Sequence, residues 1–188
     1  MTGSVWTIGH GLIPVEDLVA LLKKFQVDAV ADVRTSPRSE RAPQFNERTL
    51  NTVLNAAGID YVAMGDQLGG RPADLRFYDS EGYVLYRALS ESPPFVAGIE
   101  RLITGAEGHR IVVLCSESSF QRCHRNLLVG RALRRRGMAV THILHDGSTR
   151  SFDDYLVTEV GLSGLEEDPW RSLVQVRPEL AQRTSSLA

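Results

Sequence analysis

Short runs of apolar residues alternate along the chain with longer stretches in which apolar residues recur every three or four positions. The short runs predict β-strands, at residues 5–8, 28–33, 60–64, 111–115 and 139–144. The periodic stretches predict helices, at residues 14–25, 46–57, 83–89, 94–104, 120–136 and 152–160. Pro14 and Gly137 support two of these boundaries, because proline suits the first turn of a helix and glycine the residue after its end.

This alternation of strands and helices predicts a three-layer α/β fold, in which a mostly parallel, Rossmann-like sheet is flanked by helices. The length of 188 residues suits a single domain, which we expect at residues 1–160, with a partly disordered C-terminal extension at 161–188. No window of about 18 consecutive apolar residues occurs, so we expect no transmembrane helix. The first residues lack the pattern of a signal peptide.

Chemically active residues follow every proposed strand. They are the groups Gly9-His10-Gly11, Asp32 with Arg34, Gly65-Asp66 with the loop that ends at Arg71, Cys115 with Glu117, and His142 with His145. Ligands of parallel α/β sheets bind at the carboxyl ends of the strands, so these residues are expected to share one site. His109 precedes the fourth strand and is expected at the opposite edge of the sheet.

Several of these groups belong to sequence blocks that carry a family resemblance. The blocks are Thr7-Ile8-Gly9-His10, Val30–Arg34 with Pro37 and Ser39, Gly58–Tyr61 leading to Leu68-Gly69-Gly70, and Leu114–Glu117 with Cys123-His124-Arg125 and His142-Ile143. In this order, over residues 5–155, they resemble the domain of unknown function 488 family. The resemblance implies a compact α/β fold and a polar site built by the Cys–Glu and Cys–His–Arg blocks. It implies no reaction, because none is assigned to the family as a whole.

Cys115 is the first candidate for catalysis. The dipole of the helix that follows it, together with Arg122 and Arg125, favours a thiolate, whereas Glu117 nearby would oppose one. A buried structural cysteine is the alternative interpretation. Six residues without glycine separate Cys115 from Arg122, a spacing unlike that of a phosphatase loop.

The block Cys123-His124-Arg125 supplies the second group of candidates. Cys123 is either a small core residue or a second site thiol. Arg34 and Arg125 are expected to clamp a phosphate or carboxylate, because buried charges need partners. The spacing from Cys115 to Cys123 and His124 does not match a zinc knuckle and no second cysteine pair exists, so we predict no metal site.

Net charge and amino-acid composition limit the kinds of function that the protein can have. The formal net charge of −2 excludes a strongly basic polymer-binding protein. Of the 21 cationic residues, Lys23 and Lys24 are lysines and the other 19 are arginines, whose planar fork suits phosphate and carboxylate. Codon bias in a GC-rich genome is the explanation that we favour for this excess, since a site needs only a few arginines. Two cysteines are too few for a disulfide scaffold, which favours a reducing cytoplasm.

Three functions are compatible with these residues. The first is an enzyme acting on a small anionic or nucleotide-like substrate: Cys115 is nucleophile or redox thiol, Glu117 or His124 moves protons, and Cys123 is a resolving thiol. Its substrate-binding residues are His10, Asp32, Arg34, Arg71, Arg122 and Arg125. The second is a module that binds nucleotides or single-stranded nucleic acid without catalysis. The third is a redox sensor that joins Cys115 to Cys123. The sequence identifies neither a cofactor nor an oligomeric state. It predicts no interaction with a membrane.

Overall fold

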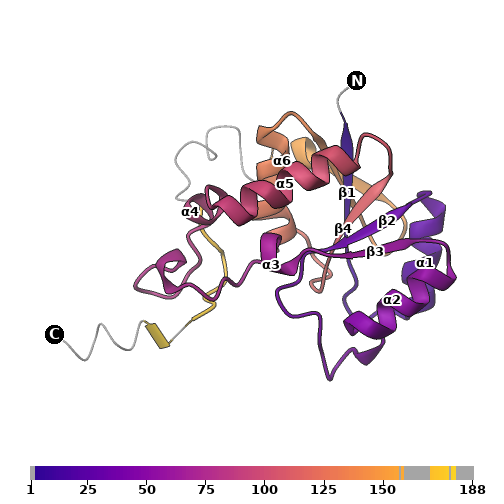
Figure 1. Cartoon of the computed structure of the whole chain (residues 1–188), viewed down its shortest axis with the longest axis horizontal. Coiled ribbons are helices and arrows are strands. Elements are labelled where there is room, and N and C mark those ends of the chain that lie inside the picture. Colours follow the sequence, from indigo (N-terminus) through magenta and orange to yellow (C-terminus); the bar gives the residue numbers. More distant parts are fainter. Residues whose placement is uncertain (1–2, 157, 159–169, 178, 181–188) are drawn as a thin grey trace.

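A computed structural model describes residues 3–156, 158, 170–177 and 179–180 of the chain (Figure 1). Its strands are β1 (Ser4–Gly9), β2 (Ala29–Asp32), β3 (Asp60–Ala63), β4 (Ile111–Cys115), β5 (Ala139–Ile143) and β6 (Thr149–Ser151). They form one six-stranded sheet in the order β3-β2-β4-β1-β5-β6, in which all neighbours pair in parallel except β5 and β6. The predicted α/β class is therefore confirmed.

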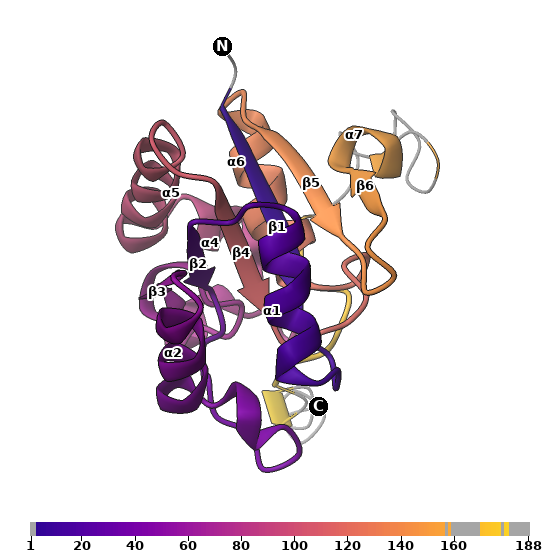
Figure 2. The ribbon, with the colours of Figure 1, turned by 90° about the vertical axis from the view of Figure 1, so that its right-hand side faces the viewer.

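Helices cover both faces of this sheet. The α-helices are α1 (Val15–Lys24), α2 (Glu47–Ala56), α3 (Gly65–Leu68), α4 (Tyr86–Ser90), α5 (Pro93–Gly105), α6 (Arg131–Arg135) and α7 (Phe152–Tyr155). Two short 3₁₀ turns, η1 (Pro43–Phe45) and η2 (Leu75–Phe77), and a π-helix, η3 (Arg125–Gly130), complete the described elements. Figure 2 shows α1 in front of the sheet, on the same side as α2, and α6 behind it.

The core has two halves because successive residues of a strand point to opposite faces. Val112 and Leu114 of β4 pack with the buried leucines of α1 and α2, namely Leu18, Leu22, Leu50 and Leu54. Ile111 and Val113 pack on the other face with Phe95, Ile99 and Leu102 of α5. Every residue of β4 is buried, as expected for a central parallel strand.

Two expected elements differ from the observed ones. The helix expected at residues 120–136 begins only at Arg125, as η3, because Phe120 to His124 form a turn closed by a hydrogen bond from the Cys123 amide to the Phe120 carbonyl. The helix expected at 83–89 begins at Tyr86. The strand β6 was not expected, since its three residues are too few to show a period.

Part of the expected C-terminal extension packs on the domain. Trp170 is buried with the guanidinium groups of Arg131 and Arg135 over its ring, and its indole Nε1 donates to the Leu127 carbonyl. Residues 161–169, 178 and 181–188 of the extension lie outside the described residues, as do residues 157, 159 and 160 of the helix expected at 152–160. Among the described helices, none has the length and apolar character needed to span a membrane.

A close backbone contact joins the ends of β1 and β4. Gly9 pairs in register with Cys115, and a Cβ atom on Gly9 would lie 1.7 Å from the carbonyl oxygen of Glu117. No side chain fits in that space. Glycine at position 9 therefore allows the chain after β4 to cross over the end of β1.

This contact makes Gly9→Ala strongly destabilising. The new methyl group meets backbone rather than a flexible side chain, so we expect the unfolding free energy to fall by about 3 kcal/mol or more in urea denaturation. Gly108→Ala is the matched control, because a Cβ there meets nothing within 4 Å. It should change stability by no more than about 0.5 kcal/mol. Equal effects of the two substitutions would contradict the contact.

Candidate functional site

The site lies where the direction of the chain connections changes. β1 leads to α1 on one face of the sheet, whereas the neighbouring β4 leads to α6 on the other (Figure 2). Parallel α/β sheets bind ligands at such a point, beyond the carboxyl ends of the strands. Cys115 is the last residue of β4, and its carbonyl accepts a hydrogen bond from the amide of His10, directly after β1.

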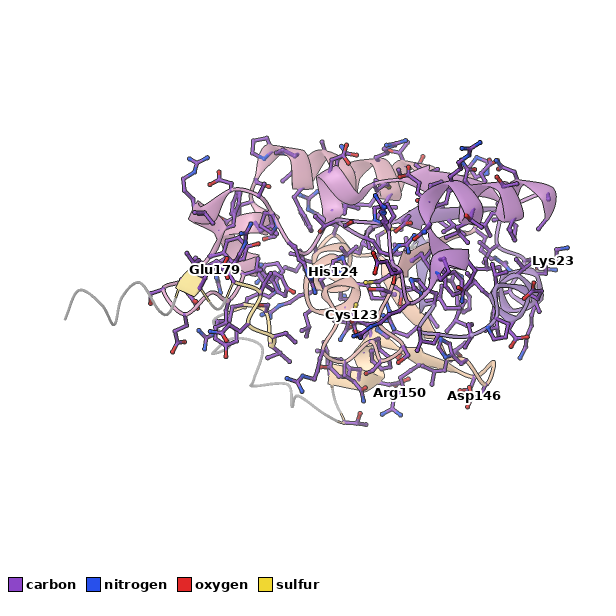
Figure 3. The ribbon with its side chains drawn as sticks, turned by 90° about the horizontal axis from the view of Figure 1, so that it is seen from below. Lys23, Cys123, His124, Asp146, Arg150 and Glu179 are labelled. Atoms are coloured by element: carbon purple, nitrogen blue, oxygen red, sulfur yellow. The ribbon has the colours of Figure 1, made fainter. Side chains whose placement is uncertain are left out.

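Cys115, Cys123 and His124 meet at this point and form what we call the thiol–imidazole cluster. The Nδ1 atom of His124 lies 3.5 Å from Cys115 Sγ and 3.9 Å from Cys123 Sγ. All three atoms lie within 4.8 Å of one another. Figure 3 shows Cys123 and His124 close together near the middle of the molecule. Both cysteines are buried free thiols, and His124 is half-buried.

A hydrogen bond at the second ring nitrogen, Nε2, sets the orientation of the His124 ring. Nε2 lies 3.0 Å from the carbonyl oxygen of Val33, which can only accept, so Nε2 carries the proton and donates it. Nδ1 is thereby turned toward both sulfur atoms. A Cβ at position 70 would lie 2.6 Å from His124 Cγ, so Gly70 lets the loop after α3 pack directly on the ring.

The cluster shifts the pKa values of all three groups. A hydrogen bond from the Cys123 thiol, followed by the charges of His124 and Arg125, lowers the pKa of Cys115 despite its burial. Burial, together with the negative sulfur of Cys115, raises the pKa of Cys123. Burial opposes the protonation of His124, but the attraction of Cys115 outweighs it, so the pKa of His124 is raised. The arrangement favours a Cys115 thiolate beside a His124 imidazolium.

A second group of polar residues lies at the ends of β1 and β2. Arg34 binds the Asp32 carboxylate with two parallel bonds, from Nε at 2.9 Å and from Nη2 at 2.5 Å. The Tyr61 hydroxyl donates to the same carboxylate at 2.7 Å, and Nη1 of Arg34 lies 3.2 Å from His10 Nε2. The fork of Arg34 is thus engaged within the protein. His10, Asp32 and Arg34, which the sequence assigned to substrate binding, form one buried network.

Arg125 is also engaged internally. Its Nη1 donates to the Glu117 carbonyl at 2.5 Å and its Nη2 to the Ser118 carbonyl at 3.0 Å, while the buried Nε has no partner in the described part of the chain. The Glu117 side chain is exposed, so its main-chain carbonyl, not its carboxylate, takes part in this arrangement.

The other two predicted arginines lie at the surface. Arg122 is exposed and donates to the Leu173 carbonyl at 3.3 Å. Arg71 is exposed, and its amide is anchored by the Thr35 hydroxyl. Burial, then the charges of Cys123 and Cys115, raise the pKa of the buried Tyr86, and the charge of Arg71 opposes them. Arg71 and both thiols therefore lie close enough to the Tyr86 hydroxyl for their charges to affect its pKa.

Comparison with known proteins identifies the family. A family model described as domain of unknown function DUF488 matches residues 14–132. The chain belongs to the DUF488 family. The match contains the thiol–imidazole cluster together with Asp32, Arg34 and Arg125. A search of the curated proteins finds no match to this chain.

The structure of this DUF488 chain places His142, which the sequence assigned to the shared site without a role, next to the supporting residues of the cluster. His142 lies beside the cluster's supporting residue Arg125: its Nδ1 is 2.7 Å from the Thr7 hydroxyl, and its ring stacks on Phe120 at 4.1 Å between centroids. Burial, and then the charge of Arg125, lowers the pKa of His142 to about 3. His142 lies near the carboxyl end of β5, and this position was the sequence feature that pointed to the site. Sequence reasoning missed the Val33 carbonyl, because a main-chain group is not visible in a pattern of side chains.

The buried His10 of this DUF488 protein predicts a stability that depends on pH. Burial is the main cause that lowers the pKa of His10 to about 4, below the usual value near 6.5, so the unfolded chain binds the extra proton first. We expect the unfolding free energy to fall by about 3 kcal/mol as the pH falls from 6.5 to 4 because of this residue.

His10→Gln isolates the effect, because a glutamine can still accept from Arg34 but does not titrate. Urea denaturation at several pH values should show a shallower acid slope for this variant. His142 contributes in the same direction, so part of the slope should remain. His109→Gln, at an exposed residue near the start of β4, should keep the wild-type slope. An unchanged slope in His10→Gln would contradict a neutral buried His10.

Proposed function

We propose that this protein is a cysteine-dependent enzyme acting on a small anionic substrate, with Cys115 as the nucleophile. The observation that carries the proposal is the distance of 3.5 Å between Cys115 Sγ and His124 Nδ1, at the crossover point of the sheet. A thiol beside an imidazole that is itself held by a third group is the usual arrangement for nucleophilic catalysis by cysteine.

Each member of the cluster has a role in this proposal. His124 takes the thiol proton of Cys115 at Nδ1, while the bond from Nε2 to the Val33 carbonyl keeps the ring in place. Cys123 donates a hydrogen bond to the resulting thiolate. The neighbouring Arg125 stabilises that negative charge and holds the main chain around it.

The proposed substrate is anionic because Arg71, an exposed arginine, directly follows the loop that packs on the cluster. Arg34 and Arg125 are engaged in internal hydrogen bonds, so they are better suited to positioning than to ligand binding. Arg71 is exposed, follows the Gly69-Gly70 pair that packs on His124, and shares the surroundings of Tyr86 with both thiols. We therefore assign the anion-binding role to Arg71, whose planar fork suits a phosphate or carboxylate.

The nucleophile is tested by alkylation with iodoacetamide at pH 7, followed by peptide mass spectrometry. We expect Cys115 to react faster than Cys123, and His124→Gln to slow its reaction by about 10-fold or more, because the thiolate loses its partner. His109→Gln removes an exposed imidazole near the start of β4 and should leave the rate unchanged. Equal rates at the two cysteines, or no effect of His124→Gln, would refute the assignment of Cys115 as the nucleophile.

The anion site is tested by protection. Inorganic phosphate and adenosine monophosphate should slow alkylation of Cys115 in the wild type and should lose this effect in Arg71→Gln. Arg71→Lys keeps the charge but not the fork, so partial protection is expected. Arg122→Gln, which changes an exposed arginine directed to Leu173, is the matched control. Full protection in Arg71→Gln would show that Arg71 does not bind the anion.

A further inference from the structure

The three side chains of the thiol–imidazole cluster are also the ligand types that zinc prefers. Zinc bonds of 2.3 Å to sulfur and about 2.05 Å to nitrogen at tetrahedral angles place sulfur and nitrogen about 3.6 Å apart, and two sulfur atoms about 3.8 Å apart. The observed separations from His124 Nδ1 are 3.5 Å to Cys115 Sγ and 3.9 Å to Cys123 Sγ. Both sulfur–nitrogen separations therefore match those around one bound ion, and the two sulfur atoms lie within 4.8 Å of each other.

The His124 ring is oriented as a metal ligand requires. A ligating histidine offers one unprotonated nitrogen and donates its other N–H to a carbonyl or carboxylate, which fixes the tautomer and the ring plane. Here Nε2 donates to the Val33 carbonyl at 3.0 Å, and Nδ1 is turned to the sulfur atoms. This bond joins residues 91 positions apart, so the fold, not the local sequence, sets the ring.

The chemistry of the cluster selects the kind of metal. It contains two soft sulfur ligands and one imidazole but no carboxylate, which disfavours Mg²⁺ and Ca²⁺. Two thiolates balance the charge of one divalent ion, so the loaded site is neutral and suited to its burial. Among the residues that the structure describes, no second group of three histidine, cysteine or carboxylate side chains is spaced to hold a metal.

We propose that Cys115, Cys123 and His124 bind one Zn²⁺ ion, with the fourth coordination position left to water or a ligand. The sequence spacing argued against zinc because a knuckle takes its ligands from one short loop. Here one ligand ends a strand, and the other two come from the turn before η3. Binding releases the thiol protons and occupies the sulfur lone pair of Cys115, so zinc and the nucleophile compete for the same atom.

The test uses the reduced full-length protein, titrated with Zn²⁺ by calorimetry and with Co²⁺ by absorption spectroscopy. We expect one ion per chain, a thiolate-to-Co²⁺ charge-transfer band and tetrahedral d–d bands, and no binding of Mg²⁺. Cys123→Ser and His124→Gln should each weaken Zn²⁺ binding by more than about 100-fold, because loss of a ligand exceeds the effect of losing its support. His109→Gln, at an exposed histidine, should bind as the wild type does.

Circular dichroism of each variant shows whether it remains folded. Cys115→Ser removes the third proposed ligand and should weaken Zn²⁺ binding as well. Absence of stoichiometric binding, or wild-type affinity in folded Cys123→Ser and His124→Gln, would overturn the zinc site. If the cluster variants still bind Zn²⁺ and adding His109→Gln to them abolishes that binding, the ion sits at a surface site. That result would also overturn the zinc site proposed here.

Alkylation separates this proposal from the proposed enzyme. Saturating Zn²⁺ should suppress modification of Cys115, and a chelator should restore it. If metal-free protein has a reactive Cys115 but binds no Zn²⁺, the zinc site fails and the nucleophile stands. If Zn²⁺ binds as described but Cys115 is unreactive without metal, the nucleophile fails and the zinc site stands.

Discussion

The geometry at the carboxyl edge of the sheet depends on how the chain is held after β4. The Glu117 carbonyl lies over Gly9, in space that any side chain at position 9 would fill, and the guanidinium of Arg125 binds that carbonyl and the next one. A fork with two donors holds two consecutive carbonyls, which a lysine ammonium does with poorer geometry. The turn that follows then brings Cys123 and His124 back to Cys115, so these backbone contacts support the whole cluster.

The arginines of this edge divide into structural and accessible ones. Arg34 is held by Asp32 and approached by His10, and Arg125 is held by carbonyls, so both are buried with their hydrogen bonds inside the protein. A buried guanidinium needs such partners, since an unpaired buried charge is very costly. Arg71 is exposed instead. Burial, more than proximity to the strand ends, thus distinguishes a supporting arginine from one that can meet a ligand.

One cluster supports two kinds of chemistry because a thiolate is both a nucleophile and a metal ligand. In neutral His124, the Nδ1 lone pair that would accept the thiol proton in the proposed enzyme is the one that would coordinate the ion in the proposed zinc site. Its fixed orientation, through the Val33 carbonyl, serves either purpose. Both proposals use the sulfur of Cys115, and both cysteines are buried, so the two proposals make competing claims on one atom.

The sequence by itself determined the α/β class, the family and the strand that carries Cys115: residues 111–115 are apolar throughout, and a strand buried on both faces leaves that mark wherever it lies. Only the tertiary structure decided the use of the side chains beyond the strand ends. Glu117 contributes its carbonyl, Arg34 and Arg125 face inward, and the helix expected from residue 120 starts at Arg125. These outcomes depend on contacts between distant segments, such as Gly9 with Glu117 and His124 with Val33, which no local period records.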